Sequence, residues 1–140
     1  IGNAYKEKGD YNEALEYYLK SYEIRKKAYA DNLNHPNIAS SLYNISFAYE
    51  CKRDYYRALE YLEILYEIRK KVYANNPNHP DITSLLNNIS IVYKIKGDYK
   101  KSIEFLEILY EIRQKFYADN PNHPDLASLL NDIGNLYYKK

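Results

Sequence analysis

Apolar residues recur along most of this chain at the three- and four-residue spacing of a single helical face. The segment 81–96 shows the pattern clearly, with apolar side chains at Ile82, Leu85, Leu86, Ile89, Val92 and Tyr93. Such spacing is typical of an amphipathic helix. No stretch shows the alternation of apolar and polar residues that marks a half-buried strand. The pattern therefore predicts an all-α chain.

Glycine, proline and short polar runs indicate where the helices begin and end. Gly97 suits a helix C-terminus because glycine readily adopts the left-handed conformation found there, and Asp98 is a candidate N-cap for the next helix. Pro124 follows a loop-like run of Asp and Asn, and it suits a first helical turn because its missing N–H loses no bond there. We predict seven helices, the first truncated, over 1–8, 11–30, 37–52, 55–74, 81–96, 99–118 and 125–140.

The chain repeats itself every 44 residues. Ile1, Ile45, Ile89 and Ile133 are each 44 residues apart and begin similar phrases. The segments 45–88 and 89–132 are identical at 28 of 44 positions. A period of this length marks a solenoid, a propeller or an array, and a propeller would need strands. We therefore predict one array, with repeat units of about 1–36, 37–80 and 81–124 and a final half repeat over 125–140.

Each repeat carries large, small and aromatic residues in a fixed order. A Leu precedes the repeated Ile by three residues, a small residue follows the Ile, and a Tyr comes three residues later. These residues are Leu42, Ile45, Ser46 and Tyr49, then Leu86, Ile89, Ser90 and Tyr93, then Leu130, Ile133, Gly134 and Tyr137. The next helix carries a small residue at Ala14, Ala58 or Ser102. This order resembles the tetratricopeptide repeat.

Two further features resemble the longer repeat of the kinesin light chain type. The second helix of each unit continues through an E-I-R-x-K phrase, at 67–71 for example, and the linker reads N-H-P-D. The linker is about two residues longer than in that type, Leu takes the family's tryptophan position, and Arg53 stands where Gly9 and Gly97 recur. The resemblance implies a right-handed solenoid of antiparallel helix pairs, in which the first helix of each repeat lines a concave groove.

One face of these first helices varies between repeats, and we predict that it binds a peptide or a partner helix of another protein. One position of the repeat, for example, is occupied by Phe47, Ile91 and Asn135 in successive units. This face also has many Asn residues, whose side-chain amides can donate to and accept from a peptide backbone. The face comprises Asn3, Lys6 and Glu7, then Ser40, Tyr43, Asn44, Phe47, Glu50 and Cys51, then Ser84, Asn87, Asn88, Ile91, Lys94 and Ile95, then Ser128, Asn131, Asp132, Asn135, Tyr138 and Lys139. It has no Arg, so the specificity of the carboxylate-clamp subfamily is not carried over.

The last helix supports an alternative function, that of a structural array which self-associates end to end. No helix follows it in the sequence, so we expect its apolar side to be uncovered. Exposed apolar ends promote stacking, because solenoids usually need polar caps for solubility. The residues on this side are Leu126, Leu129, Leu130, Ile133 and Tyr137.

Tyrosine and histidine also recur in columns at the repeat period. We interpret the Tyr columns as packing ladders between repeats, at Tyr5/49/93/137, Tyr11/55/99, Tyr22/66/110 and Tyr29/73/117. His35, His79 and His123 would lie about 10 Å apart at helix-packing distance, whereas zinc ligands lie about 2.0–2.1 Å from one ion. We therefore predict no metal site and assign these residues, with the His-Pro-Asp phrases that two of them begin, to linker and helix-capping roles.

Composition excludes several classes of function. The chain has 20 Lys and Arg against 19 Asp and Glu, without the basic excess of a nucleic-acid binder. No apolar run approaches the length of a membrane span. Cys51 is the only cysteine, which favours a reducing, cytoplasmic location. No phosphate loop or catalytic set interrupts the repeats, so we predict neither enzymatic activity nor a cofactor.

Overall fold

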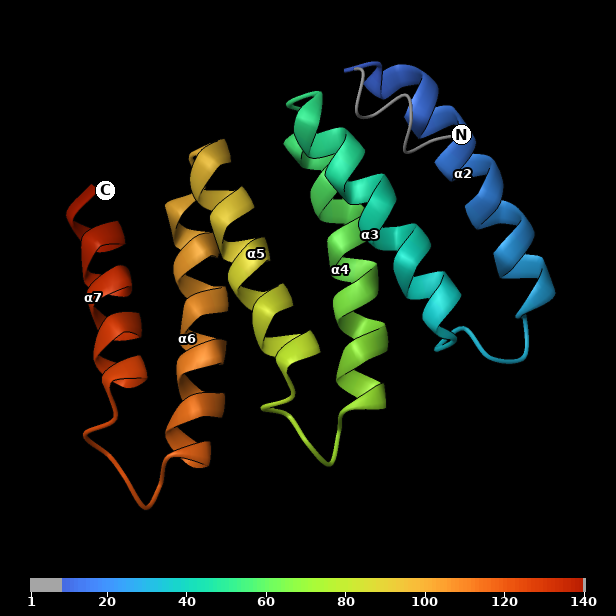
Figure 1. The fold of residues 1–140 in the computed structure, drawn as a ribbon. Helices are drawn as coiled ribbons and strands as arrows, with labels where there is room; N and C mark the ends of the chain where they lie inside the picture. The colour runs from blue at the N-terminus through green and yellow to red at the C-terminus, as the bar shows by residue number, and fades with distance from the viewer. Residues whose placement is uncertain (1–8, 140) are drawn as a thin grey trace. The chain divides into compact units, whose positions relative to one another are not determined.

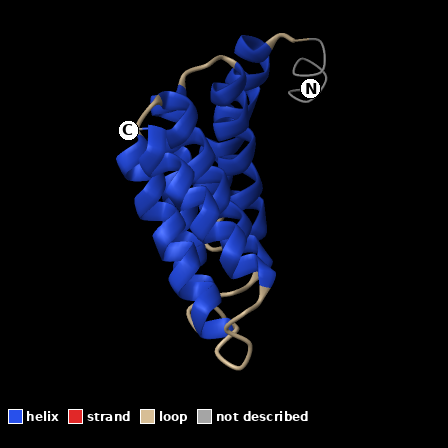
Figure 2. Cartoon of the chain, turned by 90° about the vertical axis from the view of Figure 1, so that its left-hand side faces the viewer, coloured by secondary structure: helices blue, strands red, loops and turns tan. Residues whose placement is uncertain are grey.

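The structure is a computed structural model that describes residues 9–139, and it shows six helices there. They are α2 (Tyr11–Ala28), α3 (Pro36–Cys51), α4 (Tyr55–Val72), α5 (Pro80–Lys96), α6 (Tyr99–Phe116) and α7 (Pro124–Lys139) (Figure 1). Helices and loops account for all of the described chain, without a strand (Figure 2). The all-α prediction is confirmed, whereas the helix expected over 1–8 lies outside the described residues. None of the described helices is long and apolar enough to cross a membrane.

The second helix of each repeat ends earlier than its apolar pattern predicts. Helices α2, α4 and α6 end at Ala28, Val72 and Phe116, two residues before the expected 30, 74 and 118. The reason lies in the tyrosine that follows each helix. Its ring stacks on the histidine of the linker, so the chain has already turned away from the helix axis.

The short turns between the two helices of a repeat follow the predicted chemistry. Gly97 has a φ of 93° in the left-handed region, and the side chain of Asp98 accepts a hydrogen bond from the Lys101 N–H at 3.2 Å. Asp10 and Asp54 cap α2 and α4 in the same way. The helix end at Gly97 and the N-cap at Asp98 are therefore confirmed.

The chain divides into two compact units, Ile1–Val72 and Tyr73–Lys140. In the first unit, α3 packs against both α2 and α4. In the second unit, α6 packs against both α5 and α7. The two helices of a predicted repeat therefore stay in one unit, and contacts join helices that are consecutive in the chain, as expected for stacked repeats.

The repeated apolar columns form the core of each unit. Leu42 and Ile45 of α3 are fully buried in the first unit, and Leu86 and Ile89 of α5 are fully buried in the second. The small residue of the pattern allows helices to approach closely, because the Ser102 hydroxyl of α6 donates to the backbone carbonyl of Ser90 in α5 at 2.7 Å. The predicted core columns are confirmed in α3 and α5.

The last helix only partly follows its prediction. Leu126 and Leu129 were expected to be uncovered but are buried, at 5% and 4% exposure, because they turn toward α6. Ile133 is half-buried. Leu130 and Tyr137 are exposed, at 51% and 55%. The uncovered side of α7 is therefore narrower than the sequence pattern indicates.

The aromatic columns do not all form ladders between repeats. The rings of Tyr22 in α2 and Tyr61 in α4 pack edge to face with centroids 6.2 Å apart, a contact between consecutive repeats in which Tyr61 lies outside the predicted columns. Tyr49 instead stacks on Tyr61 at 5.9 Å, and Tyr93 stacks on Phe105 at 5.7 Å, within single repeats. These two contacts lie within a repeat, which the 44-residue period did not predict because it shows which residues recur but not which ring each one faces.

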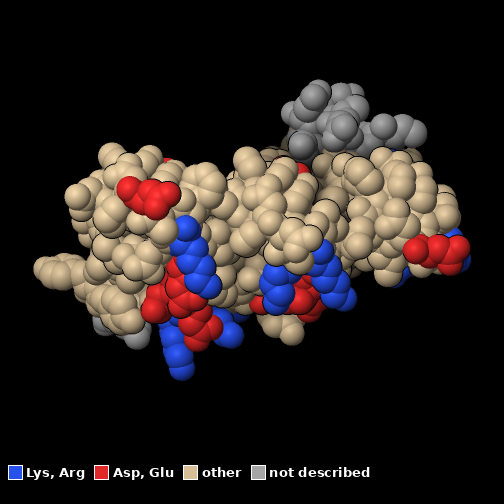
Figure 3. Space-filling view, turned by 90° about the horizontal axis from the view of Figure 1, so that it is seen from below, with Lys and Arg blue, Asp and Glu red and all other residues tan. Residues whose placement is uncertain are grey.

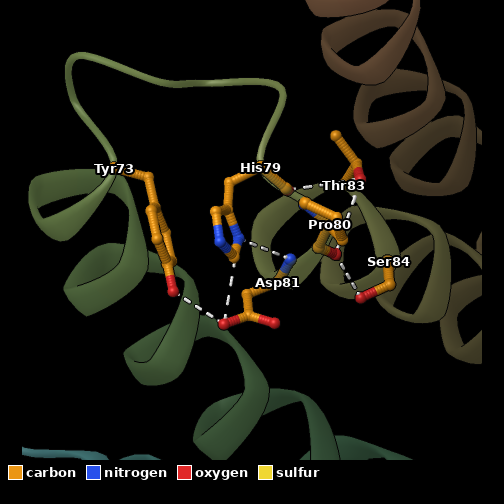
Figure 4. A network of polar contacts seen from close by, with 6 residues as sticks. All are labelled: Tyr73, His79, Pro80, Asp81, Thr83 and Ser84. Carbon is orange, nitrogen blue, oxygen red and sulfur yellow. Dashed lines mark hydrogen bonds and ion pairs between the residues drawn. The ribbon is translucent and has the colours of Figure 1, made fainter.

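The column Tyr29/73/117 lies where the helices meet the linkers, and its member Tyr73 belongs to a polar network (Figure 4). The Tyr73 ring stacks on His79 with centroids 3.9 Å apart, and its hydroxyl donates to Asp81 Oδ2 at 2.6 Å. His79 Nδ1 accepts from the Asp81 backbone N–H at 3.0 Å. The imidazole thereby caps α5, which Pro80 begins, and the capping role predicted for this histidine is confirmed.

The same arrangement recurs in the other two linkers. Tyr117 stacks on His123 at 3.8 Å and donates to Asp125 Oδ2 at 2.8 Å, and this hydrogen bond raises the pKa of the Tyr117 hydroxyl. In the first linker Asn37 replaces the aspartate, so its Nδ2 donates to the Tyr29 hydroxyl at 3.1 Å. Both networks start a helix, which confirms the interpretation of the His-Pro phrases.

Candidate functional site

Two adjoining hollows lie between α5 and α7 of the second unit, with α6 beneath them. The first, of about 260 Å³, is lined by Asn87, Ser90, Ile91, Lys94, Ser102, Leu106, Asp132, Asn135, Leu136 and Lys139. The second, of about 430 Å³, is lined by Pro80, Thr83, Ser84, Asn87, Arg113, Asp125, Ser128, Leu129 and Asp132. Because Asn87 and Asp132 line both hollows, we treat them as one feature and call it the α5–α7 groove.

Helical periodicity explains how the sequence places these side chains. In α5, the core residues Leu86 and Ile89 lie on one side, so Asn87, Ile91 and Lys94 fall on the opposite, exposed side. Ile91 is 44% exposed and presents apolar surface to the groove. The buried hydroxyl of Ser102 and the buried Leu106 side chain, both from α6, form the floor.

The groove contains part of the face predicted from the sequence. Of the residues proposed there on α5 and α7, those that line it are Ser84, Asn87, Ile91, Lys94, Ser128, Asp132, Asn135 and Lys139. The predicted residues that do not line it are Asn88, Ile95, Asn131 and Tyr138. Tyr138 is 94% exposed. The prediction therefore named a strip wider than the groove, because helical spacing alone does not show how far a neighbouring helix extends.

The corresponding face of α3, in the first unit, is more aromatic. Tyr43 and Phe47 are exposed there, at 46% and 38%. Asn44, Glu50 and Cys51 are half-buried, and burial raises the pKa of the Glu50 carboxyl. The predicted residues Asn3 and Lys6 lie outside the described part of the chain.

Sequence reasoning missed Arg113, which reaches the groove from α6. Its counterpart two repeats earlier, Arg25, donates through Nη1 to the Asn37 carbonyl at 3.0 Å and to the Ser41 hydroxyl at 2.9 Å. Leu129 takes the place of that serine in the second unit and offers no acceptor. The repeated E-I-R phrase was the available signal, because it places an arginine at the end of each second helix, near the start of the next helix.

The lysines of the described chain differ in whether they form ion pairs. Lys26 pairs with Glu23 and Lys70 pairs with Glu67, both at 3.4 Å, whereas the exposed Lys27, Lys71 and Lys100 form no ion pair within the described residues. On the face shown in Figure 3, basic and acidic groups lie side by side. Within residues 9–139, the structure contains no ion pair that engages Lys94, Lys139 or Asp132. These groove charges are therefore available to a ligand.

The described residues contain no group of three or more His, Cys, Asp and Glu that could hold a metal ion. The three linker histidines are each engaged by a tyrosine ring and a backbone N–H. The side chains that line the groove offer hydrogen bonding, apolar contact and charge.

Comparison with known proteins identifies the family. A sequence profile of the Tetratricopeptide repeat matches residues 1–71 and 37–115, which together cover more than half of the chain. The chain belongs to the tetratricopeptide repeat family. Repeats of this family generally mediate binding between proteins, and the fold typically serves as a scaffold rather than an enzyme. No curated protein matches the sequence.

Solved structures share the fold. A crystal structure from Podosopora anserina of a kinesin light chain-like protein, with nearly identical TPR-like repeats, has a TM-score of 0.68 at 22% identity. The match covers 97% of this chain and 62% of that one. BtubC (BKLC) from P. vanneervenii has a TM-score of 0.69 at 21% identity, over 98% of this chain and 52% of that one. The chain thus spans between about half and three-fifths of these proteins, and the predicted kinesin light chain-like repeat is confirmed as a fold.

Proposed function

We propose that this chain binds a segment of another protein, a peptide or a partner helix, in the α5–α7 groove. The observation that carries the proposal is the groove itself, whose hollows of about 260 and 430 Å³ adjoin each other. Concave surfaces of this kind are where proteins usually bind ligands, and polar groups in them fix the orientation of what binds. The family's general role in protein binding supports the same function.

The side chains that line the groove suit a polypeptide backbone. Asn87 and Asn135 lie on the two facing helices, and each amide can donate to a carbonyl and accept from an N–H. Ser84 and Ser128 add hydroxyls near the start of the same helices. Ile91 offers exposed apolar surface between them. A main chain lying along the groove would therefore find partners on both sides.

The aromatic face of α3 supplies a second contact surface in this proposal. Aromatic side chains are enriched among the residues that dominate binding energy at interfaces. Tyr43 and Phe47 are both partly exposed and lie one helical turn apart. We infer that they bind an apolar part of the same partner or of a second one.

The test is affinity capture with matched variants. We expect Asn87→Ala with Ile91→Ala to lower recovery of a bound protein, because both side chains line the groove. Asn131→Ala with Ile95→Ala is the control, since it removes the same residue types from exposed positions outside the groove. Circular dichroism checks that both variants fold. Equal recovery by the wild type and both variants would show that the groove is not the binding site.

A second candidate, end-to-end self-association, is favoured by the exposed side of α7. Leu130 and Tyr137 are 51% and 55% exposed, whereas Leu86 and Tyr93 hold the same repeat positions in α5 at 0% and 7%. In α5 these positions are covered by α6. A helix of a second copy could cover them in α7 in the same way.

A further inference from the structure

Two lysines line one end of the α5–α7 groove. Lys94 comes from α5 and Lys139 from α7, near the C-terminal ends of their helices, and both line the first hollow. Neither forms an ion pair within the described residues. Against these two positive charges the first hollow has one carboxylate, that of Asp132. The lining of this hollow therefore carries a net positive charge, which attracts an anionic group such as an acidic side chain.

The second hollow shares Asp132 with the first and adds one charge of each sign. Asp132 and Asp125 line the second hollow, and Arg113 is the positive group there. Asp125 already accepts a hydrogen bond from the Tyr117 hydroxyl at 2.8 Å. Asp132 takes part in no ion pair of the described chain. It is therefore the carboxylate best able to receive a basic side chain of a ligand.

The spacing of these charges sets the spacing in the ligand. Asp132 and Lys139 are seven residues apart on α7, which corresponds to about 10 Å along the helix axis. A polyproline II segment rises about 3.1 Å per residue and makes one turn in three residues. Side chains three residues apart then lie on the same side, about 9 Å from one another.

We propose that the α5–α7 groove selects an extended peptide with one acidic and one basic side chain about three residues apart. The acidic side chain lies between Lys94 and Lys139, and the basic one lies at Asp132. This inference rests on the proposed function. It adds the charges of the ligand and the order in which they lie along the groove.

The first test measures affinity by fluorescence anisotropy with four labelled eight-residue peptides on one Pro- and Asn-rich background. One peptide carries Glu and Arg three residues apart, one carries Glu alone, one carries Arg alone, and one carries neither. An exposed ion pair changes an affinity by about two- to five-fold. We expect the doubly charged peptide to bind about four- to twenty-five-fold more tightly than the uncharged one. The difference should shrink in 0.5 M salt because the charges are screened.

Matched variants and NMR locate the effect. We expect Lys94→Glu to remove the preference for the Glu-containing peptides, whereas Lys100→Glu, at an exposed position of α6 outside the groove, leaves it unchanged. The doubly charged peptide should shift the amide signals of Asn87, Ile91 and Asn135. If all four peptides shift these signals with equal affinity, the charge selection is wrong and groove binding stands.

The same set of experiments separates the inference from the proposed function. If no peptide shifts the groove amides but protein capture still depends on Asn87 and Ile91, the extended, doubly charged ligand is wrong and the groove function stands. If capture is also independent of these two residues, both proposals fail. Preference for the doubly charged peptide, lost in Lys94→Glu and kept in Lys100→Glu, supports the inference.

Discussion

The turn between the two helices of a repeat needs one residue in the left-handed region, and the chain fills this position with Gly9, Arg53 and Gly97. The φ angles are 80° at Gly9, 63° at Arg53 and 93° at Gly97. A residue with a Cβ is strained there by about 1–2 kcal/mol, while glycine adopts the conformation freely. A Cβ at Gly97 would meet no atom within 4 Å, so the difference between these residues lies in the backbone alone.

We expect Arg53→Gly to raise the free energy of unfolding by about 0.5–1 kcal/mol, because relief of strain exceeds the entropy that glycine loses on folding. Urea denaturation followed by circular dichroism measures the change. Lys52→Gly is the control, because Lys52 has an ordinary φ of −82°. This variant should have a lower free energy of unfolding than the wild type. Arg53→Gly with a stability at or below that of the wild type would contradict the strain argument.

At the scale of elements, α5 and α7 carry the same columns in different surroundings. Leu86 in α5 is fully buried, whereas Leu130, one period later in α7, is half exposed. α7 buries only Leu126, Leu129 and Leu136, all on the side toward α6. The stability contributed by a column residue therefore depends on which helices pack against it.

This difference predicts unequal costs for one substitution. Leu86→Ala should lower the free energy of unfolding by about 2–5 kcal/mol, because it leaves a cavity in a packed core. Leu130→Ala should cost less than about 1 kcal/mol, as substitutions at exposed positions usually do. Chemical denaturation at low protein concentration compares the two. Equal costs would show that Leu130 is covered in solution.

At the scale of the whole molecule, the second candidate function predicts mass that grows with concentration. Light scattering over a concentration series should show larger species for the wild type. Leu130→Lys should stay monomeric, because a charge on the exposed side of α7 opposes apolar association. Ile64→Lys is the control, since Ile64 is 43% exposed on α4, between the two ends of the array. A constant monomer mass at all concentrations would remove self-association.

Sequence alone determined the helices, the turns between them and the apolar columns. These features depend on local preferences: apolar spacing marks a helical face, Gly97 permits the left-handed turn, and Asp98 and His79 cap the helices beside them. The predicted polar side of α5, with Asn87 and Ile91, was also found, because helical periodicity separates it from the core.

Tertiary structure decided which parts of that pattern meet. Only the packed helices showed that Arg113 reaches the groove and that Tyr73 stacks on its own linker. Only they showed that Leu129 is buried while Leu130 beside it is exposed. The physical reason is that a repeat places the same residues at the same positions, whereas burial, pairing and access depend on neighbours that local sequence does not specify.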